Sequence, residues 1–435
     1  MCLKILNLLI FISLLLVSTD TNQLCTKIPN SLTIWLHKNV TLKLYSTDEV
    51  IIRSDDLNVV KLLRRDLILN QQSPVTNEYI IKGLRLGRAE LSISSPQNET
   101  ICPSIKVSVV PKRQIVDRIF DYATIIIVLM SSFIMGALIE FEKCRQCLST
   151  KTGLKAAIGG LFMHWLLLPP LSLGISKLFR YNQLQTIALF AVACAPMGTK
   201  SQQWTVIFDG DVNLSVVLTF LSTLFSFITM PLWLMTLVRM HLKVNVPFKG
   251  LVRTLACVVL PYVVSMALTK WKPSLRDITR RYVKSILIII LIFFITVGIY
   301  VSWPLFTQLH WSHFISAPSM QWAACIFGLM VSTFILQLKW QQALTFALSV
   351  GYQNIGVAFL LVRYNFPQPE SDISSTIILI IAAMGSIPLW LAFLIKKIYQ
   401  LVSTKRKQPI TKATTDLLAA KHVVEDIERK LLQTG

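Results

Sequence analysis

Nine apolar runs follow one another after residue 119, and each is close to the length that a helix needs to cross a bilayer. A hydrocarbon layer about 30 Å thick calls for about 20 consecutive apolar residues in a helix. The runs occupy residues 120–141, 154–179, 184–207, 212–237, 249–269, 284–303, 313–336, 341–362 and 374–398. We therefore expect an all-α polytopic membrane bundle of about nine transmembrane helices within residues 116–400, followed by a tail at 401–435.

The basic residues of the chain are distributed as signals for orientation in the membrane and not as a nucleic-acid-binding surface. The formal net charge is +21, but Lys and Arg lie in the polar gaps beside the apolar runs and in the tail. They are dense in the gaps 142–155 and 270–284 and absent from 304–312 and 364–373, although the gap 238–250 carries three. Basic loops face the cytoplasm. This pattern predicts an extracellular N-terminus and a cytoplasmic C-terminus, with the plasma membrane as the expected location.

The first residues have the organisation of a secretory signal. Lys4 precedes an apolar stretch from Ile5 to Val17, and small polar residues follow. Because that stretch is short for a membrane span, we interpret residues 1–21 as a cleaved signal peptide, with an uncleaved anchor as the alternative.

Residues 22–115 alternate apolar and polar side chains with a period of two, which predicts a small antiparallel β-sandwich outside the cytosol. Asn39 and Asn98 begin Asn-x-Thr glycosylation motifs, which suit such a location. Cys25 and Cys102 are the two cysteines expected in the mature segment, so one disulfide between them is predicted. Whether this domain binds a protein partner is left open.

Two apolar runs are interrupted at matching positions. The third run contains Pro196 and Gly198, and the eighth contains Gly351 and Gly356 around Gln353-Asn354. Each is the third run in a group of four, and the two groups would cross the membrane in opposite senses. Mirrored interruptions of this kind point to the binding site of a secondary transporter with an inverted repeat. The alternative is an ordinary proline kink with packing glycines.

Residues 194–232, which begin CAPMGTKSQQW and continue through GDVNLS to a Met-Pro pair, resemble the signature of the bile acid:sodium symporter family. The stretch SVGYQNIGVA is similar to the second crossing motif of that family, and the resemblance covers about residues 120–400. The added signal peptide and β-rich segment resemble its orphan branch with a long N-terminus. The resemblance implies two groups of helices, with substrate and sodium near the place where two broken helices cross.

The resemblance also implies ligands, position by position. Ser201, Thr219 and Gln353 match sodium ligands of the family. Three further ligand positions depart from its pattern, because they hold Gln202 in place of asparagine, Ser349 in place of glutamate and His164 in place of glutamine. The lost glutamate removes a formal negative charge from the predicted ion site, which weakens the attraction for a cation.

Lys200 adds a positive charge beside Ser201. A lysine at a helix centre costs about 2.5–3.5 kcal/mol on insertion scales, so it should face a cavity or a partner. One hypothesis is that its ammonium takes the place of a sodium ion, so that transport is sodium-independent or proton-linked, with His164 titrating. The alternative is that Lys200 extends toward water and His164 forms hydrogen bonds.

These features predict a secondary active transporter for amphipathic organic anions such as bile acids or steroid sulfates, coupled to sodium by resemblance. Lys200, Gln202, His164 and Asn354 are expected near the substrate. The alternative is a non-transporting ligand-binding receptor on a transporter-like scaffold. No nucleophile elbow, phosphate-binding loop or metal-ligand cluster is apparent in the sequence, so we do not expect an enzyme. Cys144 and Cys147 are interpreted as juxtamembrane thiols, not as a zinc site.

Overall fold

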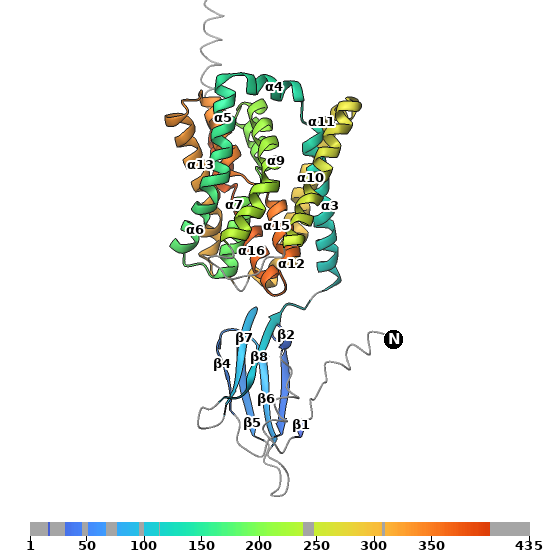
Figure 1. The fold of residues 1–435 in the computed structure, drawn as a ribbon, viewed down its shortest axis with the longest axis vertical. Coiled ribbons are helices and arrows are strands. Elements are labelled where there is room, and N and C mark those ends of the chain that lie inside the picture. Colours follow the sequence, from blue (N-terminus) through green and yellow to red (C-terminus); the bar gives the residue numbers. More distant parts are fainter. Residues whose placement is uncertain are drawn as a thin grey trace, which may run out of the picture.

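The computed structural model describes residues 16–17, 31–45, 51–66, 76–94, 100–112, 114–237, 248–306 and 309–400. Most of the predicted signal peptide, Cys25, Asn98 and the tail from residue 401 lie outside these ranges. A small β domain and a helical bundle lie end to end and are joined by a short link between Val110 and Ile115 (Figure 1).

The N-terminal domain consists of two four-stranded sheets. The strands are β1 (Leu16–Val17), β2 (Ser31–Trp35), β3 (Asn39–Tyr45), β4 (Ile51–Ser54), β5 (Val60–Asp66), β6 (Thr76–Gly83), β7 (Gly87–Ser94) and β8 (Thr100–Val110). One sheet has the order β1-β3-β6-β5 and the other β2-β8-β7-β4. Ile34, Ile81 and Leu91, from both sheets, are fully buried in one shared apolar core, so the alternating pattern does mark the inward faces of a sandwich.

The expectation of a purely antiparallel sandwich within residues 22–115 is wrong at one pair of strands. β2 pairs with β8 in parallel, with Ile34 opposite Val109. β1 also pairs with β3 in parallel, but its two residues, Leu16 and Val17, fall within the predicted signal peptide, so cleavage there would remove this strand from the sheet. β1 to β5 alternate between the two sheets, whereas β5 with β6 and β7 with β8 are hairpin neighbours within one sheet. Sequence periodicity carries no information about strand direction. Cys102 is disulfide-bonded, and Asn39 is exposed at the start of β3.

The helical bundle is built from segments that the apolar runs predict in outline. They are α3 (Ile115–Ala137), α4 (Phe141–Ser149), α5 (Lys151–Phe162), η1 (Met163–Leu167), α6 (Leu168–Leu178), α7 (Gln183–Cys194), α8 (Thr199–Ile207), α9 (Val212–Leu237), α10 (Phe248–Trp271), α11 (Ser274–Phe293), η3 (Phe294–Gly298), α12 (Ile299–Phe306), α13 (His313–Met330), η4 (Val331–Ile335), α14 (Trp340–Gly351), α15 (Ile355–Asn365) and α16 (Glu370–Met384). After a turn at Gly385, a further helical stretch reaches residue 400. In lipid only such internally bonded backbone can span.

Six of the described helices are long and apolar enough to cross a membrane. They are Ile115–Ala137, Lys151–Leu178, Val212–Thr236, Lys249–Trp271, His313–Ile335 and Glu370–Gln400. The predicted runs at 184–207 and 341–362 are each divided into two short helices, α7 with α8 and α14 with α15. The run at 284–303 belongs to α11, η3 and α12, and α11 opens with charged residues. The protein is therefore a multi-pass membrane protein with at least six spanning candidates in its described part.

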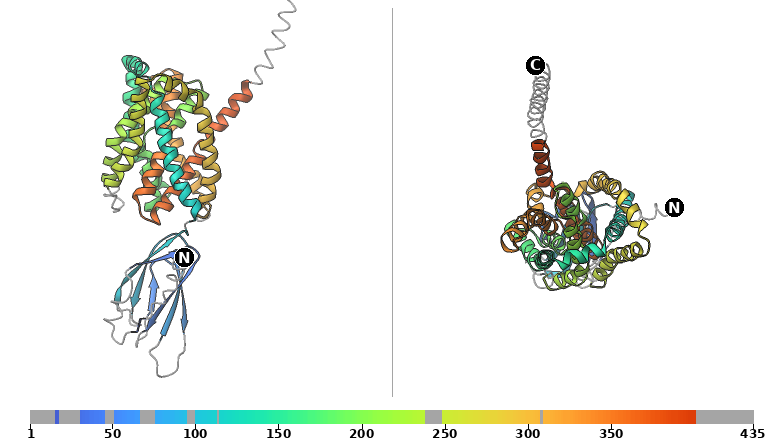
Figure 2. Two further views of the ribbon diagram at one scale, coloured as in Figure 1. Left: turned by 90° about the vertical axis from the view of Figure 1, so that its right-hand side faces the viewer. Right: turned by 90° about the horizontal axis from the view of Figure 1, so that it is seen from above.

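The bundle has two groups of helices. α3 packs most extensively on α10, and both contact α11. We call α3, α10, α11, η3 and α12 the side group, and the remaining helices the crossing group. The two groups contact each other through α9 and α10, α10 and α15, α3 and α15, and α12 and α16. The side group lies along one flank of the bundle, as Figure 2 shows from a second direction.

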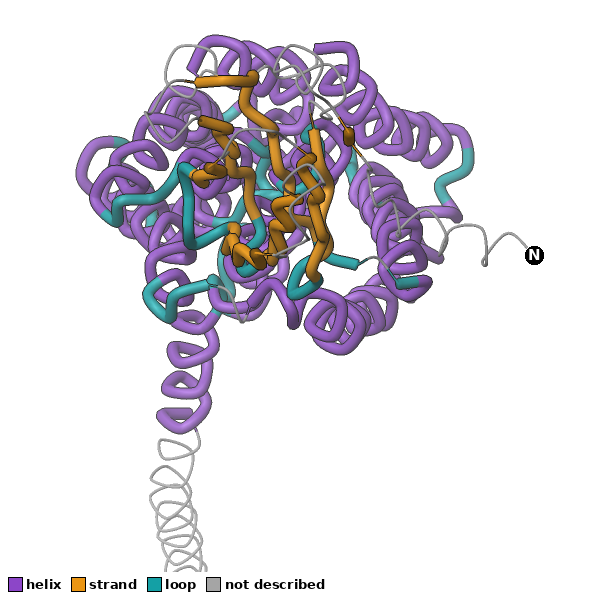
Figure 3. The backbone as a smooth tube through the Cα atoms, turned by 90° about the horizontal axis from the view of Figure 1, so that it is seen from below, coloured by secondary structure: helices purple, strands orange, loops and turns teal. Residues whose placement is uncertain are grey.

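The two ends of the bundle differ. The β domain lies beneath one end (Figure 3), whereas α4 and the helical stretch that ends at residue 400 lie at the opposite end (Figure 1). Cys144 of α4 is buried, and this burial raises the pKa of its thiol to about 11. In the described residues no group of three or more His, Cys, Asp or Glu side chains could hold a metal ion.

Gly136 tests the packing of α3 on α10. A β-carbon at this position would overlap the carbonyl oxygen of Tyr262, which is backbone and cannot rotate away. We expect Gly136→Ala to destabilise the bundle by about 1–3 kcal/mol through forced separation of the helices, measured as a lower melting temperature in detergent. Gly174→Ala in α6 is the control, because nothing lies within 4 Å of its added β-carbon. Equal melting temperatures for the two variants would contradict the close contact.

Candidate functional site

The two broken helices meet at their breaks. α7 ends at Cys194 and α8 starts at Thr199, while α14 ends at Gly351 and α15 starts at Ile355. We call residues 195–198 and 352–354 the crossing. Met197 and Gln353 form an isolated antiparallel β-bridge there. Two segments more than 150 positions apart in sequence are thus joined through their main chains.

Backbone hydrogen bonds explain how the open turns survive inside the bundle. The N–H of Gly198 donates to the carbonyl of Tyr352 at 2.8 Å, and the N–H of Asn354 donates to the carbonyl of Pro196 at 2.6 Å. Pro196 has no N–H to satisfy and cannot continue the α7 ladder. Each break therefore supplies the partner that the backbone of the other break lacks, as an apolar surrounding requires.

Gly198 is required at the crossing because of space. A β-carbon on this residue would lie 2.7 Å from the carbonyl oxygen of Gln353 and 3.0 Å from the N–H nitrogen of Asn354, both of them backbone atoms. Gly351 is equally close-packed, because its added β-carbon would overlap the sulfur of Cys325 on α13. Gly351 thus ends α14 and also acts as a packing glycine, so the two interpretations of this residue are compatible.

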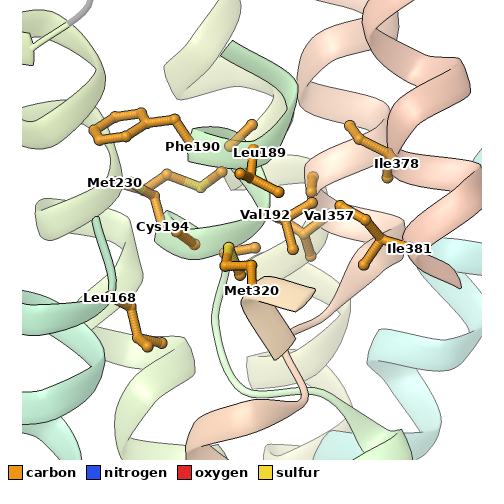
Figure 4. Packing of buried hydrophobic residues seen from close by; sticks show 14 of the residues in the cluster. Leu168, Leu189, Phe190, Val192, Cys194, Met230, Met320, Val357, Ile378 and Ile381 are labelled. Atoms are coloured by element: carbon orange, nitrogen blue, oxygen red, sulfur yellow. The ribbon is translucent and has the colours of Figure 1, made fainter. Parts of the chain in front are cut away.

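Apolar side chains surround the end of α7 beside the break. Figure 4 shows Cys194 and Val192 of α7 among Met230 of α9, Met320 of α13 and Val357 of α15. The exposed fraction of every residue from 187 to 195 is 4% or less. The crossing is therefore held in a densely packed part of the bundle, where an unpaired polar group is costly.

Hydroxyl groups of α9 continue the polar environment of the crossing. The N–H of Met197 donates to the hydroxyl of Ser222 at 3.1 Å, and this hydroxyl donates to the carbonyl of Thr219 at 3.0 Å. Thr219 in turn donates to the carbonyl of Ser215 at 2.9 Å. Ser222 is thus a contact residue that the sequence-based ligand set missed, although it belongs to the same Ser/Thr-rich run.

The predicted cation ligands lie at or next to the crossing and are buried. The exposed fractions of Ser201, Thr219 and Gln353 are 0%, 1% and 1%. Ser201 donates to the carbonyl of Gly198 at 2.7 Å, and the amide nitrogen of Gln353 donates to the carbonyl of Val350 at 2.7 Å. The donors of all three side chains are therefore used within their own segments, which leaves their oxygen lone pairs for other partners.

Several buried oxygens near these residues have no hydrogen-bond partner. They are the amide oxygen of Gln353 and the hydroxyls of Ser215 and Ser349. A buried unsatisfied acceptor in a native fold calls for an explanation, and an ion is one. Hard cations are bound by carbonyl, amide and hydroxyl oxygens. These oxygens fit a monovalent cation in type, but they supply no formal charge.

The predicted substrate residues lie on three elements, namely α8, the crossing and η1. Asn354 is half-buried and caps α15, because its side-chain oxygen accepts from the N–H of Val357 at 3.3 Å. Lys200 donates from its ammonium to the carbonyl of Ala382 on α16 at 2.8 Å. Gln202 is half-buried on α8. His164 lies in η1, buried, with both ring nitrogens lacking a hydrogen-bond partner.

A cavity lies elsewhere, between the side group and the crossing group at the end that faces the β domain. Its volume is about 490 Å³, and it contains none of the predicted site residues. Its lining includes Phe120 of α3, Tyr300 and Trp303 of α12, Phe359 of α15, and Asp372 of α16. Apolar walls with a few polar groups are typical of small-molecule sites.

The sequence analysis also missed an ion cluster on the wall of this cavity. Arg363 in the last turn of α15 pairs with Asp121 of α3 and with Asp372 of α16. Charged residues at the ends of three apolar runs were a usable signal, because such residues in spanning helices face the interior and find partners. Which residues pair could not be read from the sequence.

Comparison with known proteins confirms the family resemblance. Residues 124–308 match the model of the Sodium Bile acid symporter family. The chain is 32% identical to the hepatic sodium/bile acid cotransporter of Homo sapiens over 39% of this chain and 49% of that protein. It is 26% identical to the human ileal sodium/bile acid cotransporter, covering 66% of this chain and 82% of that protein. It is 25% identical to the sodium-dependent organic anion transporter of Bos taurus, over 58% of this chain and 66% of that protein.

The first of these alignments spans about half the length of the hepatic relative, and the family match begins inside α3. The β domain therefore lies outside the matched residues. The family consists of symporters and not of enzymes.

Gly198→Ala tests the crossing. The added methyl group must displace backbone of the second broken helix, so we expect a loss of about 1–3 kcal/mol of stability and a lower melting temperature. Gly159→Ala is the matched control, because its β-carbon would meet only the flexible end of the Leu336 side chain, at 2.8 Å. If the melting temperature of Gly198→Ala equals that of the parent protein, the close backbone contact at the crossing is wrong.

Proposed function

We propose that this chain, similar over residues 124–308 to the sodium bile acid symporters, is a secondary active transporter of amphipathic organic anions. The observation that carries the proposal is the backbone bridge between Met197 and Gln353. It joins two broken helices that lie more than 150 residues apart in the sequence. Discontinuous helices of this kind hold substrate and ion sites in secondary transporters. Alternating access would then arise from movement between the side group and the crossing group.

The cavity between the two groups supports an amphipathic substrate. Aromatic surface is supplied by Phe120, Tyr300, Trp303 and Phe359. The charged residues of the lining are Lys112, Asp117, Arg363 and Asp372, of which Arg363 is paired with Asp372 and with Asp121. The aromatic surface suits the rigid apolar body of a steroid sulfate or a bile acid, and we assign recognition of its anionic group to Lys112. Four further residues are proposed to contact the substrate deeper in the helical bundle, namely Lys200, His164, Gln202 and Asn354.

Sodium is proposed as the co-transported ion, with Ser201, Thr219 and Gln353 as ligands. The orphan amide oxygen of Gln353 and the hydroxyls of Ser215 and Ser349 support it, because they are buried acceptors of the type that a hard cation prefers. Because the described ligand set contains no carboxylate, the site attracts sodium through dipoles alone. We therefore expect a weaker apparent affinity for sodium than a charged site would give.

The proposed organisation follows from the same assignment. Residues 1–21 act as a signal peptide, 22–115 form an extracellular domain glycosylated at Asn39 and Asn98, and 401–435 lie in the cytoplasm. A disulfide from Cys25 to Cys102 would close the domain, which accords with the disulfide-bonded state of Cys102. The plasma membrane is the proposed location. The receptor alternative gains no support from the relatives, which are named as transporters.

Gln353→Leu tests the ion site. This change removes the orphan oxygen, so we expect uptake of a labelled sterol sulfate at limiting sodium to fall by about tenfold, the effect of losing one ligand worth ~1.4 kcal/mol. Counterflow into proteoliposomes, in sodium and in choline medium, measures it. Gln341→Leu is the matched control, because Gln341 lies exposed at the start of α14, the helix that ends two residues before Gln353.

Three outcomes would overturn parts of the proposal. Equal uptake in sodium and choline would exclude sodium coupling. Equal loss in both glutamine variants would remove Gln353 from the ion site. Ligand binding without accumulation under any ion gradient would favour the receptor.

Lys200→Met separates the two hypotheses for this lysine. Because its ammonium bonds to the carbonyl of Ala382, we expect the variant to lose about 1.5–3 kcal/mol of stability and to keep its sodium dependence. The melting temperature and the ratio of uptake in sodium to uptake in choline measure the two effects. A variant that gains sodium dependence would show instead that the ammonium substitutes for the ion.

A further inference from the structure

The C-terminal turn of α15 makes three polar contacts with the side group at successive residues. Arg363 pairs with Asp121 of α3, with its Nε 3.0 Å from Oδ1 and a second guanidinium nitrogen 3.3 Å from Oδ2. The Tyr364 hydroxyl donates to the main-chain carbonyl of Asp121 at 3.2 Å. The Asn365 amide donates to the hydroxyl of Thr254 on α10 at 3.0 Å. One helix end thus contacts both long helices of the side group.

The charged part of this contact is buried and bridges the two groups. Side-chain exposures are 8% for Arg363, 12% for Asp121 and 3% for Asp372. Arg363 and Asp372 belong to the crossing group, whereas Asp121 belongs to the side group. The remaining oxygen of Asp372 accepts from the amide of Gln368 at 2.9 Å, so this carboxylate is held within its own group. Movement between the groups would separate Asp121 from Arg363 and leave Arg363 with Asp372.

The energetics of buried ion pairs favour a role that depends on conformation. Desolvation of two charges offsets most of their attraction, so a buried pair contributes little net stability compared with apolar packing. The Arg363–Asp121 contact uses two parallel N–H donors, a geometry that is specific in direction and is lost by a small displacement. It also lies beside the cavity, because Arg363 and Asp372 are both part of the cavity lining.

We propose that Asp121, Arg363 and Asp372 form an ion-pair latch that holds the side group against the crossing group at the end facing the β domain and limits access to the cavity. The latch rests on the proposed function, since it acts on the movement that alternating access requires. When the side group moves away from the crossing group, the Arg363–Asp121 pair breaks, and water or an anion in the cavity takes the place of Asp121 beside Arg363. Asp372 keeps Arg363 paired in the open form, so the guanidinium is not left isolated.

Ser375→Cys provides a reporter of access that requires no transport. Ser375 is buried on α16 and lines the cavity, and the substitution is nearly isosteric. The measured quantity is the rate of labelling by a membrane-impermeant methanethiosulfonate applied from the side of the β domain. The parent protein with its native cysteines and no reporter gives the background rate.

The test variant combines Asp121→Asn, Arg363→Gln and Asp372→Asn in the reporter background. Arg363→Gln alone removes the arginine from two buried carboxylates and can fail to fold, whereas the combined variant buries no net charge and keeps hydrogen-bonding side chains. We expect its labelling rate to rise about tenfold. A change of this size corresponds to losing one interaction between contacting side chains of the strength that double-mutant cycles usually give. The melting temperature of the combined variant should stay near that of the reporter protein.

Arg88→Gln is the matched control. Arg88 of β7 pairs with Glu370 at the start of α16, so the change also removes an arginine–carboxylate pair at this end of the bundle. That pair joins the β domain to the crossing group and does not bridge the two helix groups. Its side chain is half-exposed, so we expect labelling to change by less than about twofold.

Two outcomes would overturn the latch. The first is a labelling rate in the combined variant that equals the rate in the reporter protein or in the Arg88→Gln control. The second is a combined variant that melts far below the reporter protein, because the cluster would then be a structural support. Failure of the proposed function is a separate result, since an increase in labelling without any sodium-dependent or anion uptake would leave the latch in place and exclude the transport assignment.

Discussion

The antiparallel bridge between Met197 and Gln353 is the interaction on which the centre of the bundle depends. A membrane helix interrupted by proline and glycine exposes amides and carbonyls that lipid cannot satisfy, so an isolated break would leave these groups without hydrogen bonds. Here each break bonds the other, because the N–H groups of Gly198 and Asn354 each donate to a carbonyl of the opposite segment. The close approach in turn requires that position 198 has no side chain. The remaining helices pack around a point that neither broken helix could stabilise alone.

Polar groups in the apolar bundle fall into two classes by how they are satisfied. Most buried hydroxyls, such as those of Thr219 and Thr223, donate to a carbonyl one turn back in their own helix and need nothing from elsewhere. A smaller set depends on other elements or lacks a partner, as with the amide oxygen of Gln353 and both nitrogens of His164. The first class follows from helix geometry. The second class does not follow from the geometry of a single helix, and it contains the oxygens on which the proposed ion site is built.

Sequence reasoning predicted the fold in outline because the constraints on it are local. Apolar runs of spanning length, the alternation between residues 31 and 110, and the breaks at Pro196 and Gly351 are all visible within short windows. It was wrong where pairing is not local, as in the parallel partnership of β2 with β8. It also missed the cavity and the cluster around Arg363, because these arise from contacts between Asp121 and residues about 240 positions away. Lys200 illustrates the same limit, since its acceptor on α16 has no signature in the sequence around it.

The amino-acid sequence alone predicts a multi-pass membrane protein with a small N-terminal β region and a resemblance to sodium bile acid symporters. These conclusions rest on hydrophobic length, periodicity and short motifs, which are properties of neighbouring residues. The tertiary structure alone decided which groups meet, namely the two breaks with each other, Ser222 with Met197, and Arg363 with carboxylates from two other helices. The physical reason is that a buried polar group must find its partner across space, and many arrangements of the same helices would satisfy the hydrophobic pattern equally well.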